Sequence, residues 1–459
     1  MASALMNLGT RAMFAAFSQL QTTSHNIANA SVAGFSRQEA QLATAQGQFT
    51  GAGFFGKGAD VATITRAHDA FLTREAAVAA SLAAGDRARH AQLVRLEEAF
   101  PSGERGVGHA AGQLLNAMVD LASRPQDIAT REVVLARAQE VATRFATAGG
   151  QLDALQAGVG QDLRLAVAGV NELAQRVADV NQQIARLQGF GHSPNDLLDE
   201  RDRLLGRLSE FVTVTTVAAD DGTLGVFIAG GQRLVLGNQA QQLLVKPDAT
   251  HPTRSAIFIK ESGGERPLTA DLLAHGAIGG LLRFQNDDLA PEHQALDRMA
   301  YAFASRVNGQ LALGFDLDGD SPVEPLFDLG PRGVASDMRR VLDDPRGIAA
   351  AASSTAVNGN ALALAALRDE PMVNGETITD AWASAMARVG VRVQSAATAA
   401  DISAAVQVAT ERQREARSGV NLDEEAARLI QFQQSYQAAA KVLQVAQQVF
   451  DTLLATAGR

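Results

Sequence analysis

The last helical stretch of the chain, residues 422–455, constrains the fold more than any other segment. Its apolar residues recur at alternating steps of three and four, which is the a and d pattern of a coiled-coil seam. The seam positions are Leu429, Phe432, Tyr436, Ala439, Leu443, Ala446, Phe450 and Leu453. A helix with such a seam has to lay that face against another helix.

Free-energy estimates show that this helix needs a partner. Complete burial of its large seam residues contributes on the order of 10 kcal/mol. Ordering the backbone costs about 1 to 2 kcal/mol per residue, so the segment is not stable alone. The N-terminal segment is the nearest candidate partner within the chain, and further copies in an assembly are the next.

The N-terminal segment carries its own apolar stripe. Met6, Met13, Leu20 and Ile27 follow one another at steps of seven. We expect one amphipathic helix that ends near Asn29, and then extended segments over 36–66, where Gly, Thr and Gln are frequent. Helices are expected to resume near residue 69.

Residues 69–211 have an almost wholly helical pattern. Breaks are expected at 101–108, around Pro125, near Gly149 and at 189–193. Ser193 and Pro194 predict a fresh helix, with the serine as N-cap and the proline at the first helical position.

The β-branched run that begins at Val212 predicts a change to strands, and Gly230-Gly231 predicts a hairpin. Helical period returns from Leu289 to Leu311 and again from Ala381 to Arg417. The expected fold class is mainly α with a β-rich insertion. The N- and C-terminal halves form a helical stem, and the small β domain lies far from the termini.

The expected domain boundaries follow from these changes of pattern. The chain divides into terminal helical assembly segments at 1–38 and 420–459, a helical stem at 39–211 and 276–419 with a loop at 314–345, and a β-rich inserted domain at 212–275.

Composition excludes several function classes. The net charge is −10 and no run of Lys or Arg could neutralise a phosphate backbone, which argues against nucleic acid. The chain has no cysteine, so disulfides, thiolate nucleophiles and cysteine zinc sites are excluded. No apolar run approaches the roughly 20 residues of a membrane span. The start lacks the basic region and continuous apolar core of a cleaved signal peptide.

Three motifs with possible chemistry have simpler interpretations. Residues 51–57 match a phosphate-binding loop as far as Lys57, but Gly58 stands where Ser or Thr should bind magnesium. The acidic residues of 316–320 begin like a calcium loop, yet Phe327 occupies the place of the bidentate Glu. Asp423-Glu424-Glu425 follows Asn421 as a helix cap does. The sequence therefore predicts no catalytic, metal-binding or cofactor-binding residue, no cofactor and no enzyme.

The stretch TSHNIANASVAGFSRQ at 23–38 resembles the N-terminal signature of the flagellar axial proteins, a family of rod, hook and hook-associated subunits. GVNLDEEAARLIQFQQSYQAAAKVLQVAQQVFDTLL at 419–454 is similar to the C-terminal end of a hook-associated member. SPNDLLDERD at 193–202, GFDLDGD at 314–320 and NALALAAL at 360–367 also resemble hook-associated members. The chain is short for that group, which implies a reduced or absent outer domain.

Two departures from the family pattern lie in the N-terminal signature. Phe35 stands where the family often has tyrosine, so the aromatic ring is kept without its hydroxyl. Residues 32–34 lack the proline that many rod and hook proteins have before the glycine, which favours the hook-associated subtype.

The resemblance implies a structural subunit of the bacterial flagellum that joins hook to filament and is required for filament attachment. It implies an extracellular protein, exported by the flagellar type III apparatus without a cleaved signal peptide. The implied partners are a homo-oligomer ring, the hook protein, a second hook-associated protein and an export chaperone, with no nucleic acid and no membrane span. Residues that match the family motifs are Asn26, Ile27, Asn29, Gly34, Phe35, Asn421, Asp423 and Glu424.

The expected assembly interface consists of large seam residues from both ends of the chain. These are Met6, Met13, Leu20, Ile27, Leu429, Phe432, Tyr436, Leu443, Phe450 and Leu453. The alternative functions are another flagellar axial subunit (hook, rod or second junction protein) and a type III secreted translocator, which would need long apolar spans.

Overall fold

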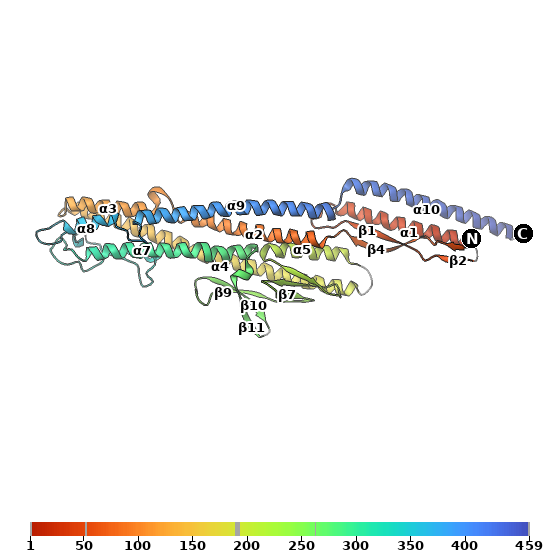
Figure 1. Ribbon diagram of the computed structural model, residues 1–459, viewed down its shortest axis with the longest axis horizontal. Coiled ribbons are helices and arrows are strands. Elements are labelled where there is room, and N and C mark those ends of the chain that lie inside the picture. The colour runs from red at the N-terminus through yellow and green to blue at the C-terminus, as the bar shows by residue number, and fades with distance from the viewer. Residues whose placement is uncertain (1, 51–52, 189–192, 262, 458–459) are drawn as a thin grey trace.

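A computed structural model describes residues 2–50, 53–188, 193–261 and 263–457. Figure 1 shows a long, narrow molecule whose two chain ends lie at the same tip. We call that tip the terminal rod, formed by α1 (Ala2–Asn29), α10 (Leu422–Ala457) and the strands from 38 to 66. The other helices form a longer bundle, the stem, and the remaining large sheets lie along one side of it. The predicted fold class, mainly α with a β-rich insertion, is confirmed.

The helices of the stem come from both halves of the chain. They are α2 (Ala70–Glu98), α3 (Val107–Ser123), α4 (Ile128–Gln188), α5 (Asn195–Phe211), α6 (Gly276–Arg283), α7 (Ala290–Leu311), α8 (Gly359–Ala366) and α9 (Ile378–Ser418). The longest, α4, has 61 residues and therefore extends for about 90 Å. The predicted helix limits near residues 29, 69, 211 and 422 are confirmed.

The strands form separate antiparallel sheets. In the rod β1 (Gln38–Thr44) pairs with β4 (Ala59–Arg66), and β2 (Gln48–Thr50) pairs with β3 (Gly53–Phe55). The insertion contains β5 (Thr215–Ala218), β6 (Leu224–Ile228), β7 (Gln232–Leu236) and β8 (Gln239–Ala240) in one sheet. Its second sheet has the order β11-β10-β9, with β9 (Leu243–Pro247), β10 (Ser255–Glu261) and β11 (Gly264–Leu268). A short pair, β12 (Phe327–Asp328) and β13 (Arg339–Arg340), lies in the loop at 314–345.

Amide side chains attach the insertion to α4. The side chain of Asn171 donates to the Leu243 carbonyl at 2.9 Å and accepts from the Leu243 amide at 2.8 Å. Asn181 donates to the carbonyls of Leu224 at 2.9 Å and Gly237 at 3.0 Å. Each amide side chain thus satisfies backbone groups at a strand end, which fixes both sheets on one helix.

Two buried carboxylates, Asp288 and Glu292, join the start of α7 to arginines of α2 and α9. The carboxylate of Asp288 is 1% exposed and accepts two bonds from Arg89, at 2.7 and 2.9 Å. Glu292, which is 2% exposed, pairs with Arg388 at 3.1 Å. Asp288 lies in a π-helical segment, Phe284–Leu289, between α6 and α7. Each buried carboxylate needs its arginine partner, because an unpaired buried charge is costly.

The predicted break near Gly149 is wrong. Helix α4 continues through this position, and the glycine meets the short helix Ala335–Asp337 instead. A Cβ at Gly149 would lie 2.5 Å from the amide nitrogen of Ser336. Glycine is therefore needed here because two chain segments approach each other closely. In the sequence, such a glycine looks the same as one that ends a helix.

The predicted N-cap at Ser193 is also wrong. Helix α5 begins at Asn195 with Pro194 in the cap position, and the Ser193 hydroxyl bonds to the Asn195 side chain at 3.0 Å. The Asn195 side chain is held by the rod, as described below, and this fixes the first turn of the helix. Of the expected break at 189–193, residues 189–192 lie outside the described residues.

Candidate assembly interface

The terminal rod is built around an antiparallel pair of helices, α1 and α10 (Figure 1). The pair approaches closely at Gly9, where a Cβ would lie 3.0 Å from Leu443 Cγ. The other deeply buried positions of the two seams are also mostly small. They include Ala15, Ala16, Thr22 and Thr23 of α1 and Ala439 and Ala446 of α10. Small residues allow the two backbones to come together and leave larger neighbours at the flanks.

The large predicted interface residues all lie on this helix pair. Most of them are half-buried: Met6, Met13, Leu20, Ile27, Leu429, Phe432, Tyr436 and Leu443. Phe450 is 43% exposed and Leu453 is 54% exposed, because these residues lie on the last turns of α10. Their contact with another subunit stays a prediction.

A further set of apolar residues in the rod is left uncovered by the chain itself. Val442, Val445 and Val449 recur at steps of three and four beside the seam and are 41%, 57% and 40% exposed. Phe14 and Phe17 of α1 are 62% and 53% exposed. Contiguous exposed apolar residues mark a protein interface. Sequence reasoning missed this set because it followed the a and d positions alone.

The hairpin arm of the rod also exposes aromatic rings. Strands β1 and β4 lie against α1, and Arg11 of the helix pairs with Asp60 at 2.5 Å. Phe54 is 80% exposed, and its ring centroid lies 5.5 Å from that of Phe49. The predicted glycine-rich turn at 51–57 lies partly outside the described residues, and β4 follows it in place of the helix that a phosphate loop requires.

Asn26, a residue of the predicted family motif, connects three segments at the base of the rod. Its side chain is 1% exposed and exchanges two 2.9 Å hydrogen bonds with the backbone of Gln38 in β1. It also donates to Glu425 Oε2 of α10 at 3.0 Å. One amide therefore joins α1, β1 and α10.

Carboxylates of α5 connect the rod to the stem. Asp199 accepts from the Ser36 amide at 2.9 Å and from Arg66 at 2.7 Å, and Arg66 also lies 2.7 Å from Asp202. Charge-assisted bonds of this length are strong. The pKa of His68, 3.5 Å from Asp202, is lowered mainly by burial and also by Arg66, against the opposing effect of Asp202.

The first turn of α5 adds two amide hydrogen bonds to the same connection. Asn195 donates to the Ile64 carbonyl of β4 at 2.9 Å, and the Gln38 side chain donates to Asp196 at 3.0 Å. The stretch at 193–202 therefore holds the rod in place. Sequence reasoning found this stretch only as a resemblance, because its contacts join residues more than 100 positions apart.

The remaining motif residues shape the ends of the two rod helices. Asn29 donates to the His25 carbonyl at 2.9 Å, Gly34 has φ +79°, and the ring of Phe35 packs edge-on against His25 at 5.4 Å. Asn421 accepts from the amides of Asp423 at 3.0 Å and Glu424 at 3.4 Å, which confirms the predicted cap. The ring of Phe35 thus contributes packing without a hydroxyl.

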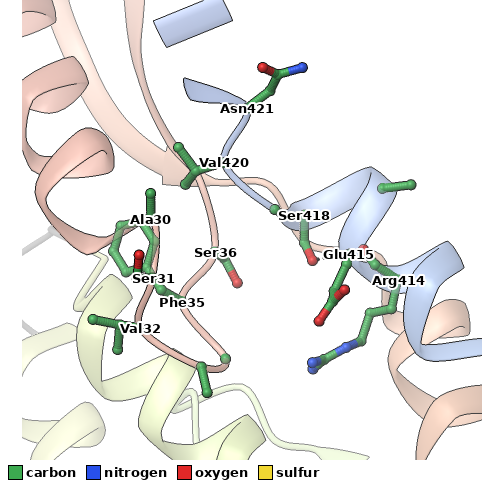
Figure 2. Close-up of a pocket in the computed structure, with 14 residues that line it drawn as sticks. Ala30, Ser31, Val32, Phe35, Ser36, Arg414, Glu415, Ser418, Val420 and Asn421 are labelled. Atoms are coloured by element: carbon green, nitrogen blue, oxygen red, sulfur yellow. Dashed lines mark hydrogen bonds between the residues drawn. The ribbon is translucent and has the colours of Figure 1, made fainter. Parts of the chain in front are cut away.

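A cavity of about 630 Å³ lies where rod meets stem. The loop at 30–36 forms one wall and the segment at 414–421 forms the other, and Figure 2 shows Arg414 and Glu415 projecting from α9 into the space between them. The backbone amide of Arg37 donates to the Ser418 carbonyl at 2.8 Å beside it. The cavity thus lies between the rod and the stem on this side.

Among the residues that the structure describes, no group of three or more His, Asp or Glu side chains is placed to hold a metal ion. Asp316 accepts from the amides of Asp318 and Asp320, both at 2.9 Å, as in a simple turn. No helix in the described ranges has the length and apolarity needed to cross a membrane.

Comparison with known proteins gives two family matches. The family described as "Flagellar hook-associated protein FlgK helical domain" matches residues 93–327. The family described as "Flagellar basal body rod FlgEFG protein C-terminal" matches residues 412–456. The second match covers the end of α9 and nearly all of α10.

Whole-length relatives carry the name flagellar hook-associated protein 1. The protein from Salmonella typhimurium is 28% identical, and the alignment covers 98% of this chain and 99% of the relative. The relative from Bacillus subtilis is 26% identical over 99% of this chain and 98% of its own length. The Salmonella alignment extends over 550 positions, more than the 459 residues of this chain, so the relative contains segments without a counterpart here.

The fold also resembles that of a solved structure. The flagellar hook junction protein FlgK from Burkholderia pseudomallei superposes with a TM-score of 0.69 at 19% identity. The match covers 76% of this chain and 100% of that structure.

Proposed function

The chain belongs to the family of the flagellar hook-associated protein FlgK, and we propose that it joins hook to filament through its terminal rod. As a member of this family it is a structural subunit of the bacterial flagellum, located outside the cell and associated with other flagellar proteins. The observation that carries the proposal is the set of apolar residues that the rod leaves uncovered.

The proposed assembly is a ring of copies held together by their rods. Each large apolar side chain moved from water into such a contact contributes about 1.5 to 3 kcal/mol. Val442, Val445 and Val449, together with Phe14 and Phe17, are placed to supply this free energy without loss of the α1–α10 pair. In this proposal the segments 1–38 and 420–459 serve assembly. The segments 39–211 and 276–419 form the body of the subunit, which carries the insertion at 212–275.

The proposed neighbours are the hook protein on one side and a second hook-associated protein on the other. We propose export through the flagellar type III apparatus without a cleaved signal peptide, with a chaperone before export. The absence of cysteine supports this route, because no disulfide obstructs an extended chain. The proposed role requires neither catalysis nor a cofactor.

Another axial subunit is the less favoured candidate. The match to the flagellar basal body rod family is confined to residues 412–456. The relatives that match over the whole length are hook-associated proteins. A translocator is not favoured either, since the described helices lack an apolar span.

Val445→Asp tests the proposed contact. Val445 is 57% exposed, so a carboxylate there stays hydrated in the free chain but has to lose water in an assembly. Cells that carry the variant should secrete the chain in normal amounts, yet electron microscopy should show hooks without filaments. Val323→Asp is the matched control, because Val323 lies in the stem loop and is 96% exposed. Normal filaments in the Val445→Asp strain would contradict the proposal.

A further inference from the structure

The apolar seam between α1 and α10 repeats every seven residues, so its pattern fits more than one register. The small residues Gly9, Ala16 and Thr23 recur at steps of seven, as do Ala439 and Ala446. A repeat of seven matches itself again after a shift of one heptad. Sliding α10 by seven residues would therefore still place apolar side chains against α1 over most of the interface.

One polar contact breaks this repeat. Glu425 is 1% exposed, its Oε2 accepts from Asn26 at 3.0 Å, and Arg428 lies 3.7 Å from its Oε1. Seven residues further along α10 the corresponding position is Phe432. A shift of α10 by one heptad towards the stem would place the phenyl ring of Phe432 against the Asn26 amide. The buried Glu425 carboxylate would then lose the hydrogen bond from Asn26, which costs free energy.

The Asn26 side chain cannot follow such a shift. Both its oxygen and its nitrogen are bonded to the backbone of Gln38, so its position is fixed by β1. Asn26 is in this way a fixed donor on the α1 side, and Glu425 is the mobile partner on the α10 side. A polar pair inside an apolar seam is a known means of selecting one register at some cost in stability.

We propose that the Asn26–Glu425 contact sets the register of α10 on α1. The register decides which residues of α10 stand beside which residues of α1 on the outside of the rod. Glu425 is thus a positioning residue for the proposed assembly surface. The inference deepens the proposed function, but the register itself is a property of the single chain and is measured without flagella.

The cysteine-free sequence allows a clean measurement of register by disulfide trapping. Gly9→Cys with Leu443→Cys reports the observed register, in which these positions touch. Gly9→Cys with Phe450→Cys reports a shift by one heptad. Both pairs are oxidised in the purified full-length chain, and the intramolecular product is quantified by its gel mobility.

The decisive background is Glu425→Leu. It removes the α10 half of the contact and leaves Asn26 bonded to Gln38. We expect the ratio of the 9/443 product to the 9/450 product to fall about tenfold. Glu425→Gln keeps an acceptor for the Asn26 amide and should restore most of the ratio. Leu20→Ala weakens the seam elsewhere and should lower both products without changing their ratio.

Three results would overturn the inference. A ratio in Glu425→Leu equal to that of the parent chain would mean that the connection at 419–421 or the apolar packing sets the register. An equal fall of the ratio in Leu20→Ala would show a general loosening. Failure of the parent chain to form the 9/443 product would contradict the pairing itself. If Glu425→Leu cells lost their filaments while the ratio of the two products stayed unchanged, Glu425 would act in assembly without setting the register.

Discussion

The guanidinium of Arg392 on α9 donates a 2.7 Å hydrogen bond to the main-chain oxygen of Asp287. This oxygen lies four residues before Pro291, which has no amide hydrogen to offer it. Arg392 also reaches the carboxylate of Asp288 at 3.5 Å. A side chain of another helix thus replaces a backbone donor where the helix changes from π to α geometry.

Replacement of Arg392 by methionine should destabilise the stem. The Asp287 oxygen loses its donor and the buried Asp288 keeps Arg89 as its remaining close cation. We expect a loss of about 1 to 3 kcal/mol in the free energy of unfolding, measured with urea. Arg412→Met on the exposed side of α9 is the control. Equal stabilities for the two variants would show that the bond to Asp287 contributes nothing.

His293 makes the stability of the stem depend on alkaline pH. Its ring lies 3.2 Å from Asp297 and 2.8 Å from Asp153, and these partners raise its pKa from 6.5 to about 9 despite burial. A raised pKa in the folded state means that the stabilisation is complete below about pH 6.5 and is lost as the pH rises through 9. The full effect is up to about 3 kcal/mol.

Thermal unfolding between pH 6 and pH 10 checks this expectation. The melting temperature of the parent chain should fall across the alkaline part of the range, and His293→Gln should flatten that part of the profile. The two curves should meet near the alkaline limit. Parallel curves over the whole range would show that another group causes the pH dependence.

Local signals in the sequence predicted the elements well, and long-range contacts account for what they missed. The cap at Asn421 acts through residues within a few positions, so its side chain predicted a helix start. Gly149 looked like a helix end because its real partner, Ser336, is almost 200 positions away. Pattern reasoning cannot see such a partner.

The same limit applies to the candidate site. The seam of α10 predicted a helical partner, and α1 is that partner. The polar contacts at the base of the rod, such as Asn26 with Glu425 and Arg66 with Asp199, follow no periodicity. Asn26 and Asp199 stood out only through family resemblance, Glu425 also as part of an acidic helix cap, and Arg66 did not stand out at all. Resemblance gives no physical role until the geometry is known.

The two rod helices should be dynamic in the free monomer. In the described chain α10 has α1 as its main packing partner, and Val445 and Leu454, both 57% exposed, show how little of it is covered. Segments with few buried apolar contacts open at low free-energy cost. Hydrogen exchange on the purified monomer should therefore show weak protection in α1 and α10 and strong protection in α4. Strong protection throughout both rod helices would contradict the expectation.

A charge inside the seam should prevent stable filament attachment. Phe432 and Ile27 are half-buried on the facing helices of the rod, so an aspartate at either position has to be desolvated when the helices pack in an assembly. Cells that carry Phe432→Asp or Ile27→Asp should release flagellin monomers into the medium and lose swimming. Gel analysis of the medium and a soft-agar swimming assay provide the two measurements.

The control for these seam variants has to separate assembly from secretion. Val323→Asp places the same charge on a stem loop and should leave swimming intact. Intracellular accumulation of a seam variant would indicate an export defect, whereas its secretion without filament growth is the expected result. Ile27 lies on α1 and Phe432 lies on α10. Similar loss of filaments in both variants would show that the facing seams of the two helices act as one surface. Normal filaments in either variant would remove that residue from the interface.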